Sequence, residues 1–314
     1  MKVADYVWPV IGVSAAVFSG WLLFREIRTL SVEDLLDSFR AIDGLHWLLS
    51  GLSALVAYLA LAAYDGLALR HLGRVLPWPY VAVTSFTTYA LSHNIGASVF
   101  SGAMVRYRAY TARGLTGPEV GILVAFCSIT FFIGIAVLTA AVLLLAPDIV
   151  ARISPEADAS VAIPAALLIL ALLGAYVLAS LLHLRPLHLG PVRIVYPRPP
   201  IVALQFLVAP IEVIAAAAII YFALPAEANP GFIVVLGIFV ASFSAALLSH
   251  APGGLGILEL FFVLGLSEIP EADVLAALLI FRAFYLLIPF AISIGVVLIF
   301  ERNQLKAVQA GRSG

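Results

Sequence analysis

The sequence predicts an all-α polytopic membrane protein, with six spanning helices and two re-entrant broken helical hairpins in an inverted-topology repeat. Three observations predict this fold. First, 63% of the 314 residues are hydrophobic and 11% are charged, which excludes a water-soluble globular domain. Second, the apolar residues gather in stretches long enough to cross a bilayer. Third, a short segment of the first half of the chain returns in the second half.

Six apolar stretches have the length of about 20 residues that a membrane-spanning helix needs. They lie at residues 7–24, 45–69, 119–146, 161–184, 201–224 and 273–300. No small-residue cleavage site follows the first stretch, so we interpret it as a retained helix and not as a signal peptide. Two further apolar stretches, 81–104 and 230–266, are interrupted by helix-breaking residues. We expect each of these to enter the membrane and return to its own side.

The repeated segment lies inside the two interrupted stretches. Residues 85–93 (SFTTYALSH) return as residues 242–250 (SFSAALLSH), at an offset of 157 residues, which is half the length of the chain. Each copy runs directly into a break, with NIG at 94–96 and PGGLG at 252–256. Paired broken helices at corresponding places in two halves are typical of a transporter whose binding site lies near the bilayer midplane.

Lysine and arginine are distributed unequally between the two faces that this topology creates. Twelve lie on one face, four lie on the other, and Arg282 lies inside a span. By the positive-inside rule the richer face is cytoplasmic, so both termini are expected inside and the first hairpin enters from the cytoplasm. The twelve are Lys2, Arg70, Arg74, Arg106, Arg108, Arg113, Arg185, Arg193, Arg198, Arg302, Lys306 and Arg312, and the four are Arg25, Arg28, Arg40 and Arg152.

This arrangement makes residues 1–314 a single transmembrane domain, with a first repeat at 1–150 and a second at 161–302. Residues 185–200 contain five prolines, so they cannot form a regular helix and are expected to be a cytoplasmic linker. Between the first two spans, Ser31 can cap a helix with Asp34 three residues later. An apolar face follows, which predicts an amphipathic helix on the outer surface of the membrane.

The two breaks are candidate binding sites. A helix that begins inside the membrane exposes backbone N–H groups and the positive end of its dipole, which suit a phosphate, and Gly96 and Gly254 let an anion approach the backbone closely. His93 and His250 stand beside the breaks, where a repeat-related pair suggests gates or proton-sensitive phosphate donors. The alternatives are a packing kink with small residues at helix contacts and two hydrogen-bonded structural histidines.

Arg282 is the strongest single candidate, because a guanidinium inside a span is costly unless it faces water or an anionic partner. Glu259, seven residues after Pro252, is its counter-charge within the chain. Two interpretations stay open. The two residues form a structural ion pair, or Arg282 holds a lipid phosphate while Glu259 holds a cationic group or exchanges a proton, and each pairs with the other when the site is empty.

Arg106 and Arg108 follow the first hairpin. They are two residues apart on a helix and therefore point about 200° apart, so we expect one to face the cavity and the other the headgroups. Ordinary snorkelling of cytoplasmic arginines is the alternative. Asp65 is interpreted as an interface residue, the role of Glu212 is left open, and Cys127, the only cysteine, is expected to be a packing residue.

Five motifs resemble, in matching order, those of the lysylphosphatidylglycerol synthase transmembrane family. They are SHNIG at 92–96, SGAMVRYRAY at 101–110, AFCSITFFIG at 125–134, PGGLGILE at 252–259 and FRAFYLLIP at 281–289. The resemblance implies a flippase region that moves aminoacylated phosphatidylglycerol to the outer leaflet and lowers sensitivity to cationic antimicrobial peptides. It also implies a site on Arg106, Arg108, Glu259 and Arg282. Bifunctional members continue into a soluble aminoacyl transferase, which this sequence does not contain.

We therefore expect a lipid flippase of the bacterial inner membrane that moves an anionic or aminoacylated phospholipid of the phosphatidylglycerol type. The alternative is a non-transporting subunit that anchors or regulates a lipid-modifying enzyme. We expect no enzymatic activity, no cofactor, no metal and no nucleic-acid partner. We expect the lipid to move down its own gradient, or its movement to be coupled to protons or to the membrane potential. Expected partners are a membrane phospholipid, a separate aminoacyl lipid synthase and a second copy of the chain in a homodimer. The candidate substrate-binding residues are His93, Asn94, Gly96, Arg106, Arg108, His250, Gly253, Gly254, Gly256, Glu259, Arg282 and Tyr285.

Overall fold

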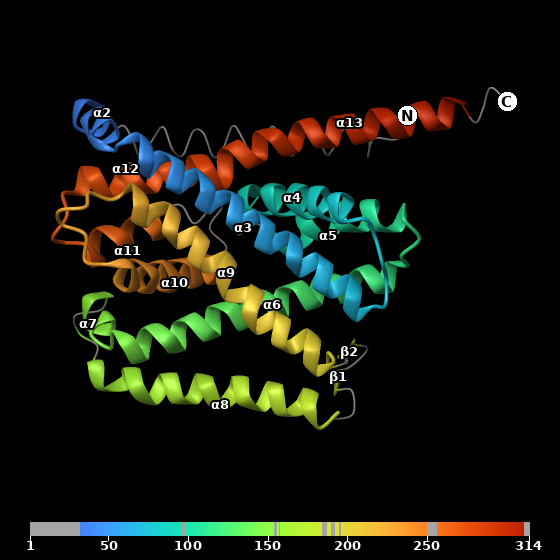
Figure 1. The fold of residues 1–314 in the computed structure, drawn as a ribbon, viewed down its shortest axis with the longest axis horizontal. Helices are drawn as coiled ribbons and strands as arrows, with labels where there is room; N and C mark the ends of the chain where they lie inside the picture. The colour runs from blue at the N-terminus through green and yellow to red at the C-terminus, as the bar shows by residue number, and fades with distance from the viewer. Residues whose placement is uncertain are drawn as a thin grey trace.

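The computed structural model describes a bundle of α-helices with one pair of short strands (Figure 1). The described residues are 32–95, 98–153, 156, 158–183, 187–189, 192–194, 196–249 and 256–310. Five helical segments in these ranges are long and apolar enough to cross a membrane: Gly44–His71, Gly117–Leu145, Ala159–Leu181, Pro199–Ala223 and Glu271–Phe300. They correspond to five of the six predicted spans, and the sixth, 7–24, lies outside the described residues. The prediction of an α-helical membrane protein is therefore confirmed, and the six spans and the re-entrant repeat stay predictions.

The first described elements are a short amphipathic helix and a long apolar one. Helix α2 (Val32–Ala41) lies where the surface helix was predicted. Asp43 then caps α3 (Gly44–His71), because its carboxylate accepts a hydrogen bond from the backbone N–H of His46 at 2.8 Å and so satisfies one of the unpaired N–H groups at the helix start. The ring of Phe39 stacks on Trp47 of α3, with centroids 6.2 Å apart, which packs α2 against the span.

Two shorter helices, α4 (Trp78–Ile95) and α5 (Ser98–Thr111), pack against each other where the first hairpin was predicted. A Cβ on Gly102 would lie 2.5 Å from Oγ of Ser92, so glycine allows the two helices to approach closely. Helix α6 (Gly117–Leu145) follows, capped by Thr116, whose backbone N–H donates to Glu119 at 2.7 Å. Short helical turns at α7 (Ile149–Ile153) and η1 (Ala159–Val161) lead into α8 (Ala162–Leu181).

The predicted linker contains the two strands. Strands β1 (Leu187–Leu189) and β2 (Val192–Ile194) pair antiparallel. The linker was predicted to extend to residue 200, but α9 (Pro199–Ala223) begins earlier. Proline has a fixed φ and lacks an N–H, so it is well tolerated at the first helical positions, where the N–H has no helical partner.

The second interrupted stretch forms α10 (Phe232–Ser249) and α11 (Ile257–Gly265), which also pack against each other. A Cβ on Gly265 would lie 2.7 Å from the side chain of Ile238. In Figure 1, α4 and α5 lie together toward one end of the long axis, and α10 and α11 lie toward the other end. The break itself, residues 250–255, lies outside the described part of the chain.

The last apolar stretch is a helix with a change of winding in its middle. Helix α12 (Glu271–Phe281) passes into the π-helical segment η3 (Arg282–Leu287) and then α13 (Ile288–Ala310). Pro289 has no N–H to offer the carbonyl of Tyr285 four residues before it, and its ring would clash with that carbonyl in a regular α-helix. The wider winding relieves this conflict, and the backbone N–H of Ile288 donates to the carbonyl of Ala283, five residues back.

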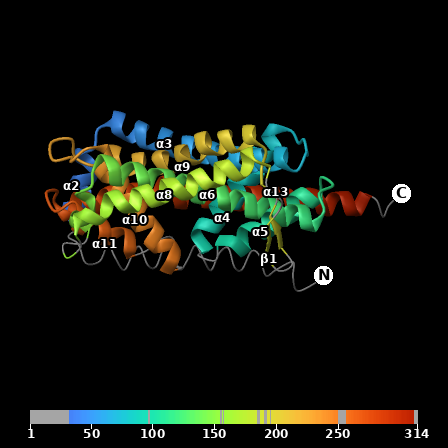
Figure 2. The same cartoon turned by 90° about the horizontal axis from the view of Figure 1, so that it is seen from below.

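Helices α3 and α9 pack along each other and cross the centre of the view in Figure 1. The hydroxyl of Tyr64 on α3 donates to the carbonyl of Ala209 on α9 at 2.9 Å, and α6 crosses at the same point, because a Cβ on Gly134 would lie 2.6 Å from that carbonyl oxygen. The 90° view shows the same helices running along the longest axis of a thinner body (Figure 2). Helix α8 covers one edge and leaves most of its apolar side chains exposed, as expected of a lipid-facing helix.

Candidate functional site

Two ion pairs are buried inside the described part of the bundle, and the first joins α3 to α5. Asp65 is completely buried and Arg106 is 5% exposed. The guanidinium donates from Nε to Oδ2 at 3.2 Å and from Nη2 to Oδ1 at 2.6 Å. This two-point geometry is the strongest form of an arginine–carboxylate contact.

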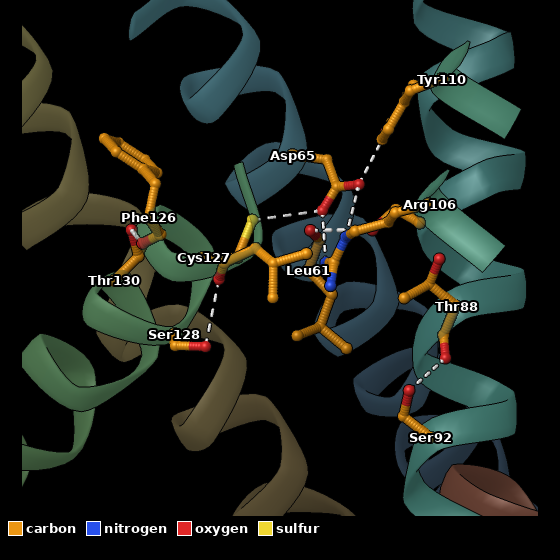
Figure 3. Close-up of polar contacts among 12 residues, drawn as sticks. Leu61, Asp65, Thr88, Ser92, Arg106, Tyr110, Phe126, Cys127, Ser128 and Thr130 are labelled. Atoms are coloured by element: carbon orange, nitrogen blue, oxygen red, sulfur yellow. Dashed lines mark hydrogen bonds and ion pairs between the residues drawn. The ribbon is translucent and has the colours of Figure 1, made fainter. Parts of the chain in front are cut away.

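Further donors complete the surroundings of Asp65 (Figure 3). The hydroxyl of Tyr110 on α5 donates to Oδ2 at 2.6 Å, and the thiol of Cys127 on α6 donates to Oδ1 at 3.4 Å. The guanidinium of Arg106 lies 4.7 Å from the ring centroid of Tyr89 on α4. The first pair therefore ties four helices together around one carboxylate whose oxygens are both bonded.

This pair corrects one sequence-based interpretation. Asp65 was interpreted as an interface residue, but it is buried, because Arg106 reaches it from α5. Arg106, which was counted with the cations of one face, is itself enclosed in protein. Arg106 is buried and Arg108 is exposed, so the two side chains differ in burial, while the expectation that one faces a cavity and the other the headgroups stays a prediction.

The second buried ion pair is the one that the sequence predicted. Glu259 lies in the first turn of α11, Arg282 is the first residue of η3, and they are 8% and 3% exposed. Nε of Arg282 donates to Oε1 at 3.0 Å, and Nη2 contacts the same oxygen. Oε2 accepts the backbone N–H of Gly256 at 2.8 Å. The pair therefore stands where α11 begins, immediately after the predicted break.

A third buried carboxyl, that of Glu212 on α9, lies near η3. The hydroxyl of Tyr285 donates to its Oε1, while Oε2 is buried and has no hydrogen-bond partner among the residues that the structure describes. The hydroxyl of Tyr58 on α3 donates to the main-chain carbonyl of Tyr285 at 2.9 Å, the carbonyl that Pro289 leaves without a helical donor. The ring of His93 stacks on Tyr285, with centroids 5.1 Å apart.

Segment η3 brings several predicted site residues together. Asn94, the residue after His93 on α4, donates to the carbonyls of Ala90 at 2.9 Å and Leu286 at 3.2 Å, so the end of α4 rests on η3. The structure thus collects the predicted residues His93, Asn94, Glu259, Arg282 and Tyr285 around η3. Gly256 lies beside Glu259 with φ +77°, in the left-handed region that favours glycine.

Other predicted site residues lie elsewhere. Arg106 belongs to the first ion pair, and no described contact joins it to Arg282 or Glu259. Gly96, His250, Gly253 and Gly254 lie outside the described residues. Sequence reasoning missed Asp65 and left Glu212 open, although both are carboxylates within apolar stretches, where an ionisable residue indicates function or a partner.

Comparison with known proteins gives consistent matches across the chain. The sequence model of the family described as lysylphosphatidylglycerol synthase TM region matches residues 10–293. An uncharacterized protein of Synechocystis sp. is 28% identical over 321 residues, covering all of this chain and 97% of that protein. Inner membrane protein YbhN of Escherichia coli is 26% identical over 258 residues, covering 81% of this chain and 80% of that protein.

A longer protein matches over the same region. The phosphatidylglycerol lysyltransferase of Staphylococcus haemolyticus is 27% identical over 279 residues. The alignment covers 87% of this chain and 31% of that enzyme. This chain therefore corresponds to about a third of the lysyltransferase.

Proposed function

The chain belongs to the lysylphosphatidylglycerol synthase transmembrane family, and from that premise we propose that it moves an anionic or aminoacylated phospholipid between membrane leaflets. The proposed substrate is of the phosphatidylglycerol type, which is the lipid named by the lysyltransferase relative. The site of the proposal is the group around η3, with Arg282 and Glu259 as the residues that meet the headgroup.

The observation that carries the proposal is the Glu259–Arg282 pair. When no ligand is present, the two residues of a buried ion pair neutralise each other. When a ligand binds, each residue can exchange its partner for a ligand group that carries the partner's charge. A lipid phosphate suits the planar guanidinium of Arg282, and the amine of an aminoacyl headgroup suits Glu259. The pair lies at the start of α11, where the positive end of the helix dipole also favours a phosphate.

The helix arrangement supports movement of lipid rather than static binding. The pairs α4–α5 and α10–α11 lie toward opposite ends of the long axis and occupy corresponding places in the order of the elements. This order fits two re-entrant hairpins in inverted repeats, 1–150 and 161–302, with six spans and cytoplasmic termini. In transporters built from such repeats, one half rocks against the other, so that the binding site opens to each side of the membrane in turn. The acyl chains would stay in the bilayer while the headgroup crosses.

The test is lipid movement by the purified protein in vesicles. Fluorescent phosphatidylglycerol is placed in both leaflets, and an impermeant reductant added outside reports how fast inner-leaflet lipid reaches the outer leaflet. We expect the protein to accelerate this exchange for phosphatidylglycerol and its lysyl ester over an uncharged diacylglycerol glycolipid. Equal rates for the glycolipid would contradict the charge-based site, and no exchange of any lipid would contradict the proposal.

A second candidate is a membrane subunit that supports a lipid-modifying enzyme. The observation in its favour is that the lysyltransferase relative carries this region in about a third of its length, so the region works there beside other parts of the same protein. A separate aminoacyl lipid synthase is the partner that this candidate requires. Copurification of such an enzyme with a chain that moves no lipid in vesicles would favour it.

A further inference from the structure

Three acidic side chains are buried in the described part of the bundle: Asp65, Glu259 and Glu212. Glu212 differs from the other two in its partners. Asp65 and Glu259 each face an arginine at ion-pair distance. Glu212, 2% exposed in the middle of α9, accepts one hydrogen bond, from the hydroxyl of Tyr285. Its Oε2 is buried without a partner, and no lysine or arginine of the described residues lies within 4 Å of the carboxylate.

The groups around Glu212 are neutral hydroxyls and apolar side chains. Tyr285 contacts it from η3, and on α3 the hydroxyls of Tyr58 and Tyr64 donate to the nearby main-chain carbonyls of Tyr285 and Ala209. In the described parts of α6, α8, α10 and α12, the other elements packed near α9, no titratable side chain contacts it. A carboxylate anion in such surroundings loses its hydration without gaining a cation. A carboxylic acid carries no charge, so burying it in these surroundings costs less than burying the anion.

The position of Glu212 connects it to the proposed lipid site. Tyr285 and Arg282 lie on the same segment, η3, three residues apart, so a change at Glu212 acts on the element that carries the headgroup pair. The ring of His93 stacks on Tyr285, and Nδ1 of His93 is likewise buried without a partner in the described structure. Asn94 bonds the carbonyl of Leu286. Loss of a proton from Glu212 would therefore disturb η3 and the end of α4 together.

We propose that Glu212 is a proton-binding site that couples lipid movement to the proton gradient, an inference that rests on the proposed function. The carboxylate takes a proton at Oε2 from a hydronium ion on one side of the membrane, which leaves a water molecule there, and the structure describes the state in which Oε2 is closed off. When water reaches the carboxyl from the other side of the membrane, the O–H bond breaks and the proton passes to that water. One proton then crosses with each cycle of η3, with no oxidant, reductant or cofactor involved. Proton binding at Glu212 and headgroup binding at Arg282 would each favour one of the two conformations of η3, and this shared dependence couples the two sites.

The protonation of Glu212 can be tested without transport. Infrared difference spectra of the purified protein between acidic and alkaline buffer report the C=O stretch of protonated carboxyls. We expect a band in the parent that is absent in Glu212→Gln and present in Glu227→Gln, a matched change at an exposed glutamate in the loop after α9. Glutamine keeps an acceptor for Tyr285, so the fold should hold. Identical spectra for the parent and Glu212→Gln would overturn the assignment.

The coupling is tested in vesicles with fluorescent phosphatidylglycerol and a pH difference of about one unit across the bilayer. We expect the gradient to change the parent rate several-fold, to change the Glu227→Gln rate equally, and to leave the Glu212→Gln rate unaltered. A Glu212→Gln variant that responds like the parent would overturn the proposal. A Glu212→Gln variant that fails to move only the lysyl ester would also overturn the proposal, because Glu212 would then bind the amine of the headgroup.

Two further results separate this inference from the function on which it rests. A parent protein that moves lipid at a rate independent of the gradient contradicts the coupling and leaves the function intact. A parent that moves no lipid at any pH contradicts the function, whatever the infrared spectra show. If Glu212→Gln is not stably inserted, Tyr285→Phe takes its place. Removing the donor to Oε1 should shift the pH at which the infrared band titrates, and an unshifted band would contradict the site.

Discussion

The two buried ion pairs have the same chemistry and different surroundings. Asp65 receives two bonds from Arg106 and one each from Tyr110 and Cys127, and all its partners lie on regular helices. Glu259 receives its bonds from Arg282 and from the backbone of Gly256. These partners lie on a π-helical segment and at a helix start, so the second pair is surrounded by irregular backbone. We infer that the first pair holds the helices together and that the second can exchange partners.

The largest effect is expected from breaking the first pair. Asp65→Ala leaves Arg106 buried without a counter-charge, which costs about 3 to 5 kcal/mol of unfolding free energy. Unfolding in mixed detergent micelles, followed by circular dichroism, measures this loss. The double variant Asp65→Asn with Arg106→Gln removes both charges and should recover part of it. If Asp65→Ala is as stable as the parent, the structural role that we assign to this pair is contradicted.

A smaller loss of stability should sharpen the same assignment. Tyr110→Phe removes one hydrogen bond to a charged carboxylate, so the unfolding free energy should fall by about 1.5 to 3 kcal/mol. The same micelle assay measures it. Tyr107→Phe is the control, because Tyr107 lies on the same helix but is exposed, and it should unfold like the parent. Equal losses in both variants would show that the bond to Asp65 adds little.

The second pair should affect transport more than folding. Glu259→Gln with Arg282→Gln removes both charges at similar volume, so the protein should insert and unfold nearly like the parent. Its rate of phosphatidylglycerol exchange in vesicles should fall about tenfold or more, which corresponds to about 1.4 kcal/mol in the barrier. Parental exchange in a stably inserted double variant would contradict the proposed site. Glu259→Gln alone should slow the lysyl ester more than plain phosphatidylglycerol.

The smallest effect is expected at Cys127. Its thiol makes the longest contact to Asp65, so Cys127→Ser should change the unfolding free energy by less than about 1 kcal/mol. The variant then serves as a background for topology. A single cysteine at Ala112 should be labelled from the cytoplasm, and one at Ser267 from outside, since both positions are exposed. The reverse result at both positions would contradict the proposed orientation of the hairpins.

The sequence predicted the pair that lies beside a visible break. Arg282 is isolated inside an apolar stretch, and Glu259 follows a cluster of glycines, so each residue is conspicuous by itself. The five described spans were predictable for a similar reason, because hydropathy over about 20 residues is a strong signal. Both predictions rest on features that a single stretch of sequence contains.

The first pair and Glu212 could not be predicted in the same way. Asp65 lies near the end of its apolar stretch and resembles an interface residue until α5 brings Arg106 against it, 41 residues later. The surroundings of Glu212 depend on which face α9 turns toward η3, and an apolar helix with no polar side has no periodicity that reveals this face. The winding of η3 follows from Pro289, but proline in a membrane helix can also be accommodated by a kink.

The π-helical segment also changes how the last span must be counted. In a regular α-helix each residue turns the chain by about 100°, and the wider winding across residues 282–287 offsets every later side chain relative to a continuous count. Substitutions scanned along residues 271–300 should therefore show two separate phases, one before Arg282 and one after Leu287. A periodicity fitted through the whole stretch would assign the wrong side of α13 to the lipid, so accessibility data for this span need two independent fits.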